Sequence, residues 1–346
     1  MAAEEVRMRP TKTKIIPILL LFLVAGATAF AQNPDLVLSQ SERDQILKNY
    51  KSFFPILGKQ AIQRGFDLPL PFGLGFSAIG MGQDILINNL QLSAGNNPTQ
   101  PVDFVQFGKN RSKAFSGTLR LDMWVLPFLN IYGLYGNGKS SMSVELTAPA
   151  AFTSSVSQSA IIYGFGLTTA IGIKRNWLSF DINWTWVDLE KLNKPAEARV
   201  LGLRYGRTIK LSEKNRLSFW VGAMKQKLGV ETGGSIALNE AVPASVWDQL
   251  GDIESTPWYQ GLTPAQKAIA TQLVDAILAN NDIPVNYSIN KGLAAPWNML
   301  AGGQISITKN WDFRIEAGFL GRFSLMAGAN YRFKIGSAGM TAKEAC

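Results

Sequence analysis

Residues 311–333 alternate between apolar and polar side chains with a period of two. Every second residue from Trp311 to Phe319 is apolar, and after a short turn at residues 320–322 the alternation resumes and runs to Phe333. Successive side chains of a strand point to opposite faces of a sheet, so the pattern predicts a β-hairpin. Each run is about ten residues long and starts or ends in an aromatic, which is typical of strands that cross a lipid bilayer. A hairpin of a soluble β-sandwich also alternates, so the rest of the chain has to decide.

The N-terminus predicts export. Basic residues precede an apolar run from Ile15 to Ala29, which has roughly the length of a signal-peptide core. Residues 29–31 are Ala-Phe-Ala, a small-x-small cleavage site, so residues 1–31 form the predicted signal peptide and the mature chain is expected to begin at Gln32. An uncleaved anchor is the alternative, but the run is short for a membrane span and Pro17 interrupts it.

Residue types that are missing exclude several kinds of chemistry. The chain has no histidine, which removes Ser-His-Asp hydrolysis, histidine-based acid–base catalysis and most zinc sites. Its only cysteine is Cys346, the last residue, so an exported chain of this sequence has no internal disulfide. No glycine-rich phosphate loop or calcium loop is convincing. We therefore expect no enzymatic activity, no catalytic or metal-binding residues and no cofactor.

The same alternation predicts further strands between residues 72 and 333. Three of the short turns between them pass through Lys and Asn, and Asn tolerates the left-handed conformation that tight hairpins need. The ten predicted strands are residues 72–92, 104–126, 129–146, 160–174, 177–187, 199–211, 216–230, 300–308, 311–319 and 323–333.

The connections alternate in length. Strands two to nine are joined in pairs by short turns, whereas residues 93–102, 147–159, 190–198 and 232–292 form long connections, and the last connection, at Gly321, is short. Short turns at one rim and long loops at the other are typical of outer-membrane barrels, and an even strand count places both termini at the short-turn rim. A soluble sandwich has no reason to segregate its loops in this way.

This arrangement resembles the bacterial outer-membrane β-barrel proteins over most of residues 72–333. The resemblance rests on the strand alternation, the loop asymmetry and a last strand that ends in Tyr331-Arg-Phe333. It implies an all-β fold, a transmembrane antiparallel β-barrel of about ten strands, in the outer membrane of a Gram-negative bacterium, with outer-membrane lipid as a partner. A terminal aromatic is what the assembly machinery of this class is understood to recognise, and this chain departs from the pattern by continuing through residues 334–346.

Two segments are not strand-like. Within residues 32–71, Ser41 and Asp44 predict the start of an amphipathic helix that reaches toward Leu57 and is kinked or ended by Pro55, followed by an extended linker. This segment is either a plug or periplasmic lid, or a packed N-terminal extension.

The insert at residues 232–292 is the second segment, and we expect it to be extracellular. Residues 263–266, Thr-Pro-Ala-Gln, predict a helix start with a capping box, followed by one apolar helical face that ends near residue 280. The insert is either a self-packed cap over the barrel mouth or a receptor or ligand surface.

Polar side chains on the inward face of the predicted strands are the candidate site. Acids and bases are mixed, so they either pair and fill a narrow interior or line a small hydrophilic channel whose charges set its selectivity. We expect the ladder on residues 312–316 to form its wall. The predicted lumen-lining residues are Arg120, Asp122, Asp181, Asn183, Arg204, Asp312, Arg314, Glu316 and Arg332.

The sequence therefore favours a porin-like channel or transport barrel for small solutes. The alternative is a closed structural or binding barrel that acts through its extracellular insert. The net charge of +9 suits contact with anionic lipid headgroups or anionic solutes, or serves solubility alone. No nucleic-acid-binding motif is present, and we expect no nucleic-acid partner. The identity of the solute and the oligomeric state stay open.

Overall fold

The fold was obtained as a computed structural model of the whole chain. The predicted signal peptide, Gln32 and Cys346 lie outside the residues that the structure describes. Within the described part, no helix is long and apolar enough to cross a membrane. The described residues are 37–94, 100–173, 176–212, 214–229, 231–237, 246, 251–279 and 284–335.

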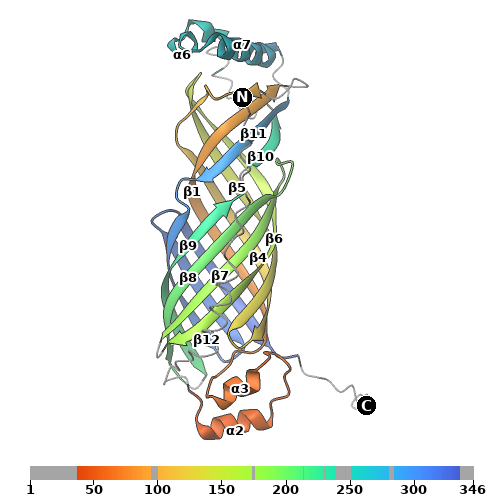
Figure 1. The fold of residues 1–346 in the computed structure, drawn as a ribbon, viewed down its shortest axis with the longest axis vertical. Helices are drawn as coiled ribbons and strands as arrows, with labels where there is room; N and C mark the ends of the chain where they lie inside the picture. The colour runs from red at the N-terminus through yellow and green to blue at the C-terminus, as the bar shows by residue number, and fades with distance from the viewer. Residues whose placement is uncertain are drawn as a thin grey trace, which may run out of the picture.

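Ten antiparallel strands close into a barrel (Figure 1), which confirms the predicted fold class. Each strand pairs with the next one along the ring, and β1 pairs with both β4 and β14, which closes it. In ring order the strands are β1 (Phe72–Ala94), β4 (Asn110–Leu126), β5 (Leu129–Ala148), β6 (Phe152–Ile173), β7 (Asn176–Leu189), β8 (Ala196–Lys210), β9 (Asn215–Leu228), β12 (Trp297–Ile307), β13 (Trp311–Phe319) and β14 (Phe323–Phe333).

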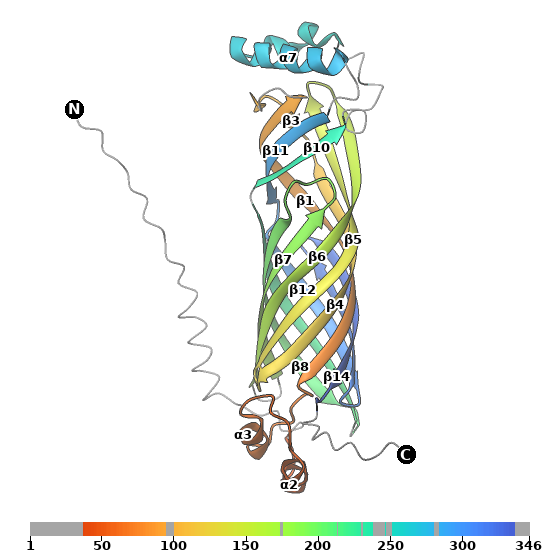
Figure 2. The same ribbon diagram turned by 90° about the vertical axis from the view of Figure 1, so that its right-hand side faces the viewer.

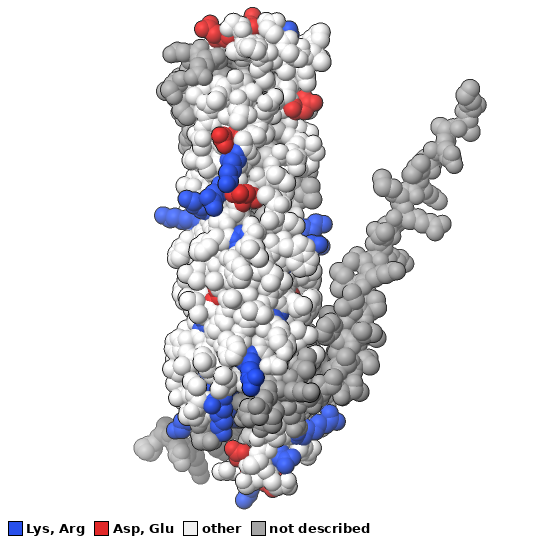
Figure 3. All heavy atoms as spheres, turned by 90° about the vertical axis from the view of Figure 1, so that its left-hand side faces the viewer, with Lys and Arg blue, Asp and Glu red and all other residues white. Residues whose placement is uncertain are grey.

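Apolar side chains cover the outer wall of the barrel. Leu121 and Ile315, for example, expose 64% and 55% of their surface on the outside. Where β1 begins and β14 ends, the ring of Phe72 stacks on that of Phe333 with 5.9 Å between the ring centroids. Figure 3 shows a wide band of the wall in which few charged atoms reach the surface. Such a band suits burial in hydrocarbon, and aromatics at its edge suit the lipid–water interface.

The upper part of the barrel continues beyond β14. The turn between β13 and β14 stops part-way up the wall, and above it β11 (Pro284–Leu293) takes the place of β14 beside β1. β10 (Glu231–Ala237) pairs in turn with β11. The short strands β2 (Gln100–Pro101) and β3 (Gln106–Phe107) pair with β1 and β5.

The predicted loop at residues 147–159 is wrong. β5 and β6 continue through most of it as a long hairpin, with Leu146 paired to Phe152. The residues that follow Phe152 are rich in Ser and Thr on both faces, so they do not alternate between apolar and polar. A strand whose outer face contacts water instead of lipid does not need apolar residues there, so it lacks the alternation by which lipid-crossing strands are predicted. Thr still favours strand conformation in such a segment.

Helices of the insert lie at the upper end of the barrel in both ribbon views (Figures 1 and 2). They are η3 (Ile253–Ser255), α6 (Pro257–Gln260) and α7 (Pro264–Ala279), which we call the cap.

The predicted capping box starts α7. The backbone N–H of Thr263 donates to Gln266 Oε1 at 3.0 Å, and that of Gln266 donates to Thr263 Oγ1 at 3.4 Å. Ala270 of α7 packs in a core with Val102 and Phe104. The indole of Trp258 donates to the carbonyl oxygen of Phe104 at 3.1 Å. The cap is therefore packed against the segment that follows β1.

Residues 37–71, which we call the N-terminal segment, lie at the lower end of the barrel (Figure 1). The segment contains α2 (Gln40–Lys48), which begins with a capping box between Ser39 and Glu42, and α3 (Gly58–Gln63). The predicted single helix that reaches Leu57 is wrong, because α2 ends at Lys48. Proline disfavours helical conformation in the residue before it, so Pro55 excludes a helix through Phe54, although α2 has already ended six residues earlier. The chain then runs along the rim, where Ile56 N–H donates to the carbonyl of Val125 at 2.8 Å.

Candidate functional site in the barrel bore

The strand register turns one set of side chains inward and connects them across the bore. Directly paired residues on neighbouring strands point to the same face of the sheet. Gly73 is paired with Asp122 and Gly202 with Asp181, so both glycines lie on the inward face beside these predicted lumen residues. All nine predicted lumen-lining residues take part in one polar network, together with three further residues. We call these twelve residues the belt: Arg120, Asp122, Asn130, Tyr132, Asp181, Asn183, Arg204, Trp220, Asp312, Arg314, Glu316 and Arg332.

Arg204 is the central member of the belt. Its Nε and Nη2 donate to the two carboxylate oxygens of Glu316 at 2.7 and 2.9 Å, and its Nη1 donates to Asp181. Each of these three side chains is at most 11% exposed. Arg204 stands on β8 and Glu316 on β13, and β9 and β12 lie between them in the ring. The bidentate pair therefore crosses the bore instead of following the wall.

Glu316 accepts two further hydrogen bonds. The indole Nε1 of Trp220 donates to its Oε2 at 2.6 Å, and Nη2 of Arg314 donates to the same oxygen at 2.7 Å. Space for the buried indole comes from Gly302, where a Cβ atom would lie 2.5 Å from the Trp220 ring. One carboxylate thus gathers two arginines and a tryptophan at the same height of the bore.

Asp122 organises the other side of the belt. Its Oδ1 accepts from Asn130 Nδ2 at 2.7 Å and from Arg332 Nη2 at 3.1 Å, and Arg332 also lies 3.4 Å from a carboxylate oxygen of Asp312. Arg332 stands on β14 and Asp122 on β4, so this contact passes over β1. It can do so because β1 carries Gly73 at that point, where a Cβ atom would lie 2.4 Å from the Asp122 carboxylate.

Tyr132 connects the two halves of the belt. The guanidinium of Arg120 lies 3.7 Å from the centre of its ring, and its hydroxyl donates to Asn183 Oδ1. Asn183 Nδ2 in turn lies 3.5 Å from a carboxylate oxygen of Asp181, which pairs with Arg204. The contacts therefore run around the inside of the barrel and return to β13.

The charges of the belt balance. It contains four arginines and four carboxylates, and each carboxylate forms an ion pair with at least one of these arginines. Paired arginine and carboxylate side chains can fill the interior of a small barrel, and the formal charges of the belt sum to zero. Among the described residues, no cluster of His, Cys, Asp and Glu is suited to hold a metal ion.

Sequence reasoning missed Trp220, Tyr132 and Asn130. All three have the inward parity of their strands, which alternation alone would have assigned. Tryptophan and tyrosine are usual in the aromatic girdles on the lipid side of such barrels, so residue type predicts an outward position for Trp220 and Tyr132. They could have been predicted by assigning every second residue of each strand to the inside regardless of residue type, and by noting that glycines on the same face leave room for large side chains.

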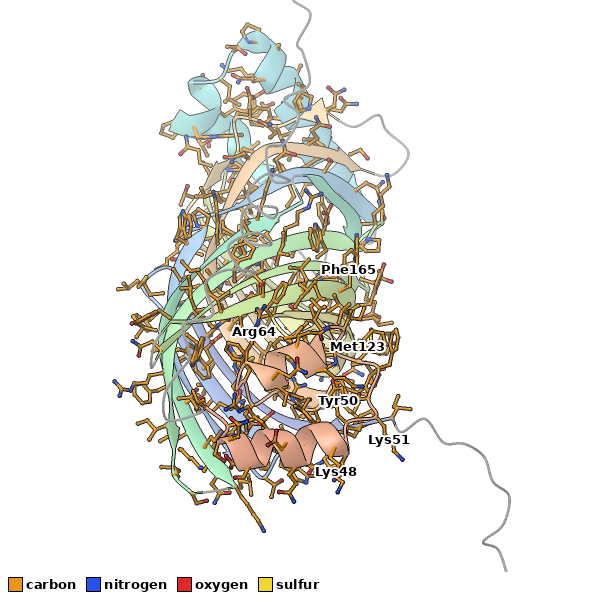
Figure 4. The ribbon with its side chains drawn as sticks, turned by 60° about the horizontal axis from the view of Figure 1, so that its bottom comes forward. Lys48, Tyr50, Lys51, Arg64, Met123 and Phe165 are labelled. Carbon is orange, nitrogen blue, oxygen red and sulfur yellow. The ribbon has the colours of Figure 1, made fainter. Side chains whose placement is uncertain are left out.

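The N-terminal segment is fastened to the lower rim by Asp67. Its carboxylate accepts from Nζ of Lys309, in the turn between β12 and β13, at 2.7 Å, and pairs with Arg216 near the start of β9. Burial by itself would raise the pKa of Asp67, but the hydrogen bonds and charges of Lys309 and Arg216 outweigh it and hold the pKa below its usual range. Figure 4, with the lower end forward, shows α2 and α3 in front of this end of the barrel, with Tyr50 between them.

Comparisons with known proteins concern the fold alone. No family model and no curated protein matches the sequence. Similar solved structures include the outer membrane protein OprG from Pseudomonas aeruginosa, at 9% identity over 78% of this chain and 98% of that one, with a TM-score of 0.35. The beta domain of the Bordetella autotransporter BrkA is 11% identical over 75% and 99%, also at 0.35. The toluene transporter TbuX of Ralstonia pickettii is 6% identical over 89% and 100%, at 0.29.

All three are outer-membrane β-barrels, the class that the sequence resembles. At these identities and TM-scores, nothing beyond the architecture is transferred, and the placement of this chain in the class rests on its own closed ring and apolar outer wall.

Proposed function

We propose that this chain is an outer-membrane barrel that conducts small solutes through a bore held closed by the belt from within and by the N-terminal segment from below. The apolar band of the outer wall supports a position in the membrane. The observation that carries the transport proposal is that β5 and β6 do not fill the bore above the belt. Their inward positions there hold glycine or side chains that stay partly exposed, such as Leu134, Gly136 and Ile162.

The belt is suited to open without unfolding the barrel. Its members contact one another through side chains, while the strand ladders that hold the wall are backbone hydrogen bonds. Arginines such as Arg204 and Arg332 have long stems and several donors, so each can exchange one carboxylate partner for another. Opening of the bore then requires a change of side-chain rotamers together with release of the N-terminal segment from Lys309 and Arg216.

Conductance in planar bilayers tests this proposal. The mature chain is compared with a variant that lacks residues 37–71 and with Arg314→Ala in each background. We expect infrequent openings of the mature chain, more frequent openings without the N-terminal segment, and a changed ion selectivity in Arg314→Ala because it upsets the charge balance of the belt. If every folded variant is silent, the transport proposal fails.

A closed barrel that acts through its insert is the second candidate. It is favoured by the packed core between the cap and Val102 and Phe104, which gives the insert a defined shape. It predicts no conductance, and loss of partner binding when residues 232–292 are removed. In neither case do we propose an enzymatic activity.

A further inference from the structure

Arg322 is a buried arginine of the bore that does not belong to the belt. It is the last residue of the turn between β13 and β14, above Glu316 along the same hairpin, and only 5% of its surface is exposed. Its backbone N–H donates to Asn298 Oδ1 at 3.0 Å, which fixes the turn against β12. The side chain extends between β1 and β9, where it contacts Gln83 and Gln226.

Every partner that this guanidinium has among the described residues is neutral. Nη1 donates to Gln83 Oε1 at 3.2 Å and to Gln226 Oε1, and Nη2 contacts the sulfur of Met224. Among the described residues, no carboxylate forms an ion pair with Arg322. The four arginines of the belt differ in this respect, because each of them has a carboxylate partner. A buried charge without a counter-charge is costly, so its retention calls for an explanation.

Two nitrogens of Arg322 have donors without an oxygen acceptor. Nε has no acceptor among the described residues, and Nη2 contacts only the sulfur of Met224. In a guanidinium, Nε–H and one N–H of Nη2 are parallel, and such a pair matches the two oxygens of a carboxylate. One guanidinium also balances one negative charge, whereas a phosphate dianion would need further cations, and the bore supplies none beside Arg322 in the described part.

Apolar side chains lie between the guanidinium and the belt. The register places Met326 beside Ile79 and Leu300 beside Gly222, all on the inward face between Arg322 and the belt, and Met224 contacts Arg322 directly. Methionine adapts its shape to different apolar partners. A charged head at Arg322 with a short apolar body against these side chains fits this arrangement.

We propose that Arg322 anchors a binding site in the bore for small monocarboxylates with an apolar chain, accepted in an edge-on bidentate fashion by Nε and Nη2. If the site is one through which solutes pass, it rests on the proposed transport function, and the solutes are then monocarboxylates of this class. As a binding site, it can be tested without any conductance.

Calorimetric titration of the full mature chain in non-ionic detergent tests the site, with hexanoate as the probe and hexan-1-ol as the neutral probe of equal length. Arg322→Gln removes the cation. Arg199→Gln is the matched control, because Arg199 is an exposed arginine paired with Glu197 at 2.5 Å on the outer side of the barrel. We expect hexanoate to bind the unchanged chain and Arg199→Gln equally, and Arg322→Gln about tenfold more weakly. Hexan-1-ol should show no dependence on Arg322.

Arg322→Lys covers the case in which Arg322→Gln does not fold, as judged by the heat-modifiable migration of folded barrels on gels. It keeps the charge and loses the bidentate edge, so hexanoate binding should be weakened. Equal hexanoate binding by the unchanged chain and the folded Arg322 variants, or no hexanoate binding by the unchanged chain, overturns the site. Silent bilayers together with Arg322-dependent hexanoate binding would instead overturn the transport proposal and leave the site standing.

Discussion

The guanidinium of Arg204 and the carboxylate of Glu316 meet across the bore through two hydrogen bonds of 2.7 and 2.9 Å, although the residues stand on strands that are not neighbours. This pair decides how the interior of the barrel should be understood. The two side chains would lie apart if the bore were open at their height. Together with the contacts of Asp122 on the other side, they support the proposal that the belt closes the bore through side chains alone.

Glu316→Gln is expected to destabilise the barrel by about 3 kcal/mol, because it leaves the buried Arg204 and Arg314 without their carboxylate. Chemical denaturation in detergent, followed by tryptophan fluorescence, measures the change. Glu197→Gln is the control, since this residue pairs with Arg199 on the exposed wall and should cost at most about 1 kcal/mol. Equal effects of the two substitutions would mean that the belt contributes nothing to stability.

Gly302→Ala should cost about 1–3 kcal/mol, because the new methyl group would lie 2.5 Å from the Trp220 indole and 2.8 Å from the carbonyl oxygen of Ile315. Gly82→Ala is a matched control, since nothing lies within 4 Å of a Cβ atom there. The same denaturation experiment compares them. A Gly302→Ala barrel as stable as Gly82→Ala would show that Trp220 does not occupy the place assigned to it.

The attachment of the N-terminal segment should depend on pH through Asp67. Because its pKa in the folded chain lies below the ordinary value of 3.8, the attachment is fully stabilised above pH 3.8 and weakens as the pH falls through the folded pKa. The carboxyl carbon-13 shift of Asp67 reports this titration.

At neutral pH, Asp67→Asn mimics the protonated carboxyl and should make the N-terminal segment more sensitive to trypsin. Asp44→Asn makes the same charge change on exposed α2 and should leave the cleavage rate as it is. Identical cleavage of the two variants would contradict the role of Asp67 as a fastening.

Ala270→Asp is expected to loosen the cap, because it buries a carboxylate in the core formed with Val102 and Phe104. Ala268→Asp places the same residue on the exposed face of α7. Hydrogen exchange of the α7 amides should be faster in Ala270→Asp and nearly unchanged in Ala268→Asp, while the exchange of the barrel strands stays the same in both. Equal protection of α7 in both variants would mean that the cap is not packed on this core.

The sequence predicts this fold well wherever lipid lies on one side of a strand and the bore on the other. That contrast produces the period of two in β13 and β14, and it also gives the inward parity of residues such as Asp181 and Glu316. The pattern disappears at residues 147–159, where both faces of the hairpin meet water, and the strands there went unrecognised.

Parity predicts which side chains face inward, but it does not predict which of them meet. Arg204 and Glu316 are 112 residues apart, and their contact depends on the stagger of four strands, while the lack of a side chain at Gly302 makes room for the Trp220 indole beside them. Arg322 lies in a turn outside the alternating runs, so no periodic pattern assigns it to the bore.

Single-channel conductance of the double variant Arg204→Ala/Glu316→Ala tests the central claim most directly. The substitutions remove one cation and one anion, so the net charge of the bore is kept while its central pair is lost. The account predicts that the unchanged chain is closed for most of the recording and that the double variant conducts for longer periods. A double variant that folds as the unchanged chain does and stays as silent, even without residues 37–71, would contradict the claim that the belt is what closes a passage.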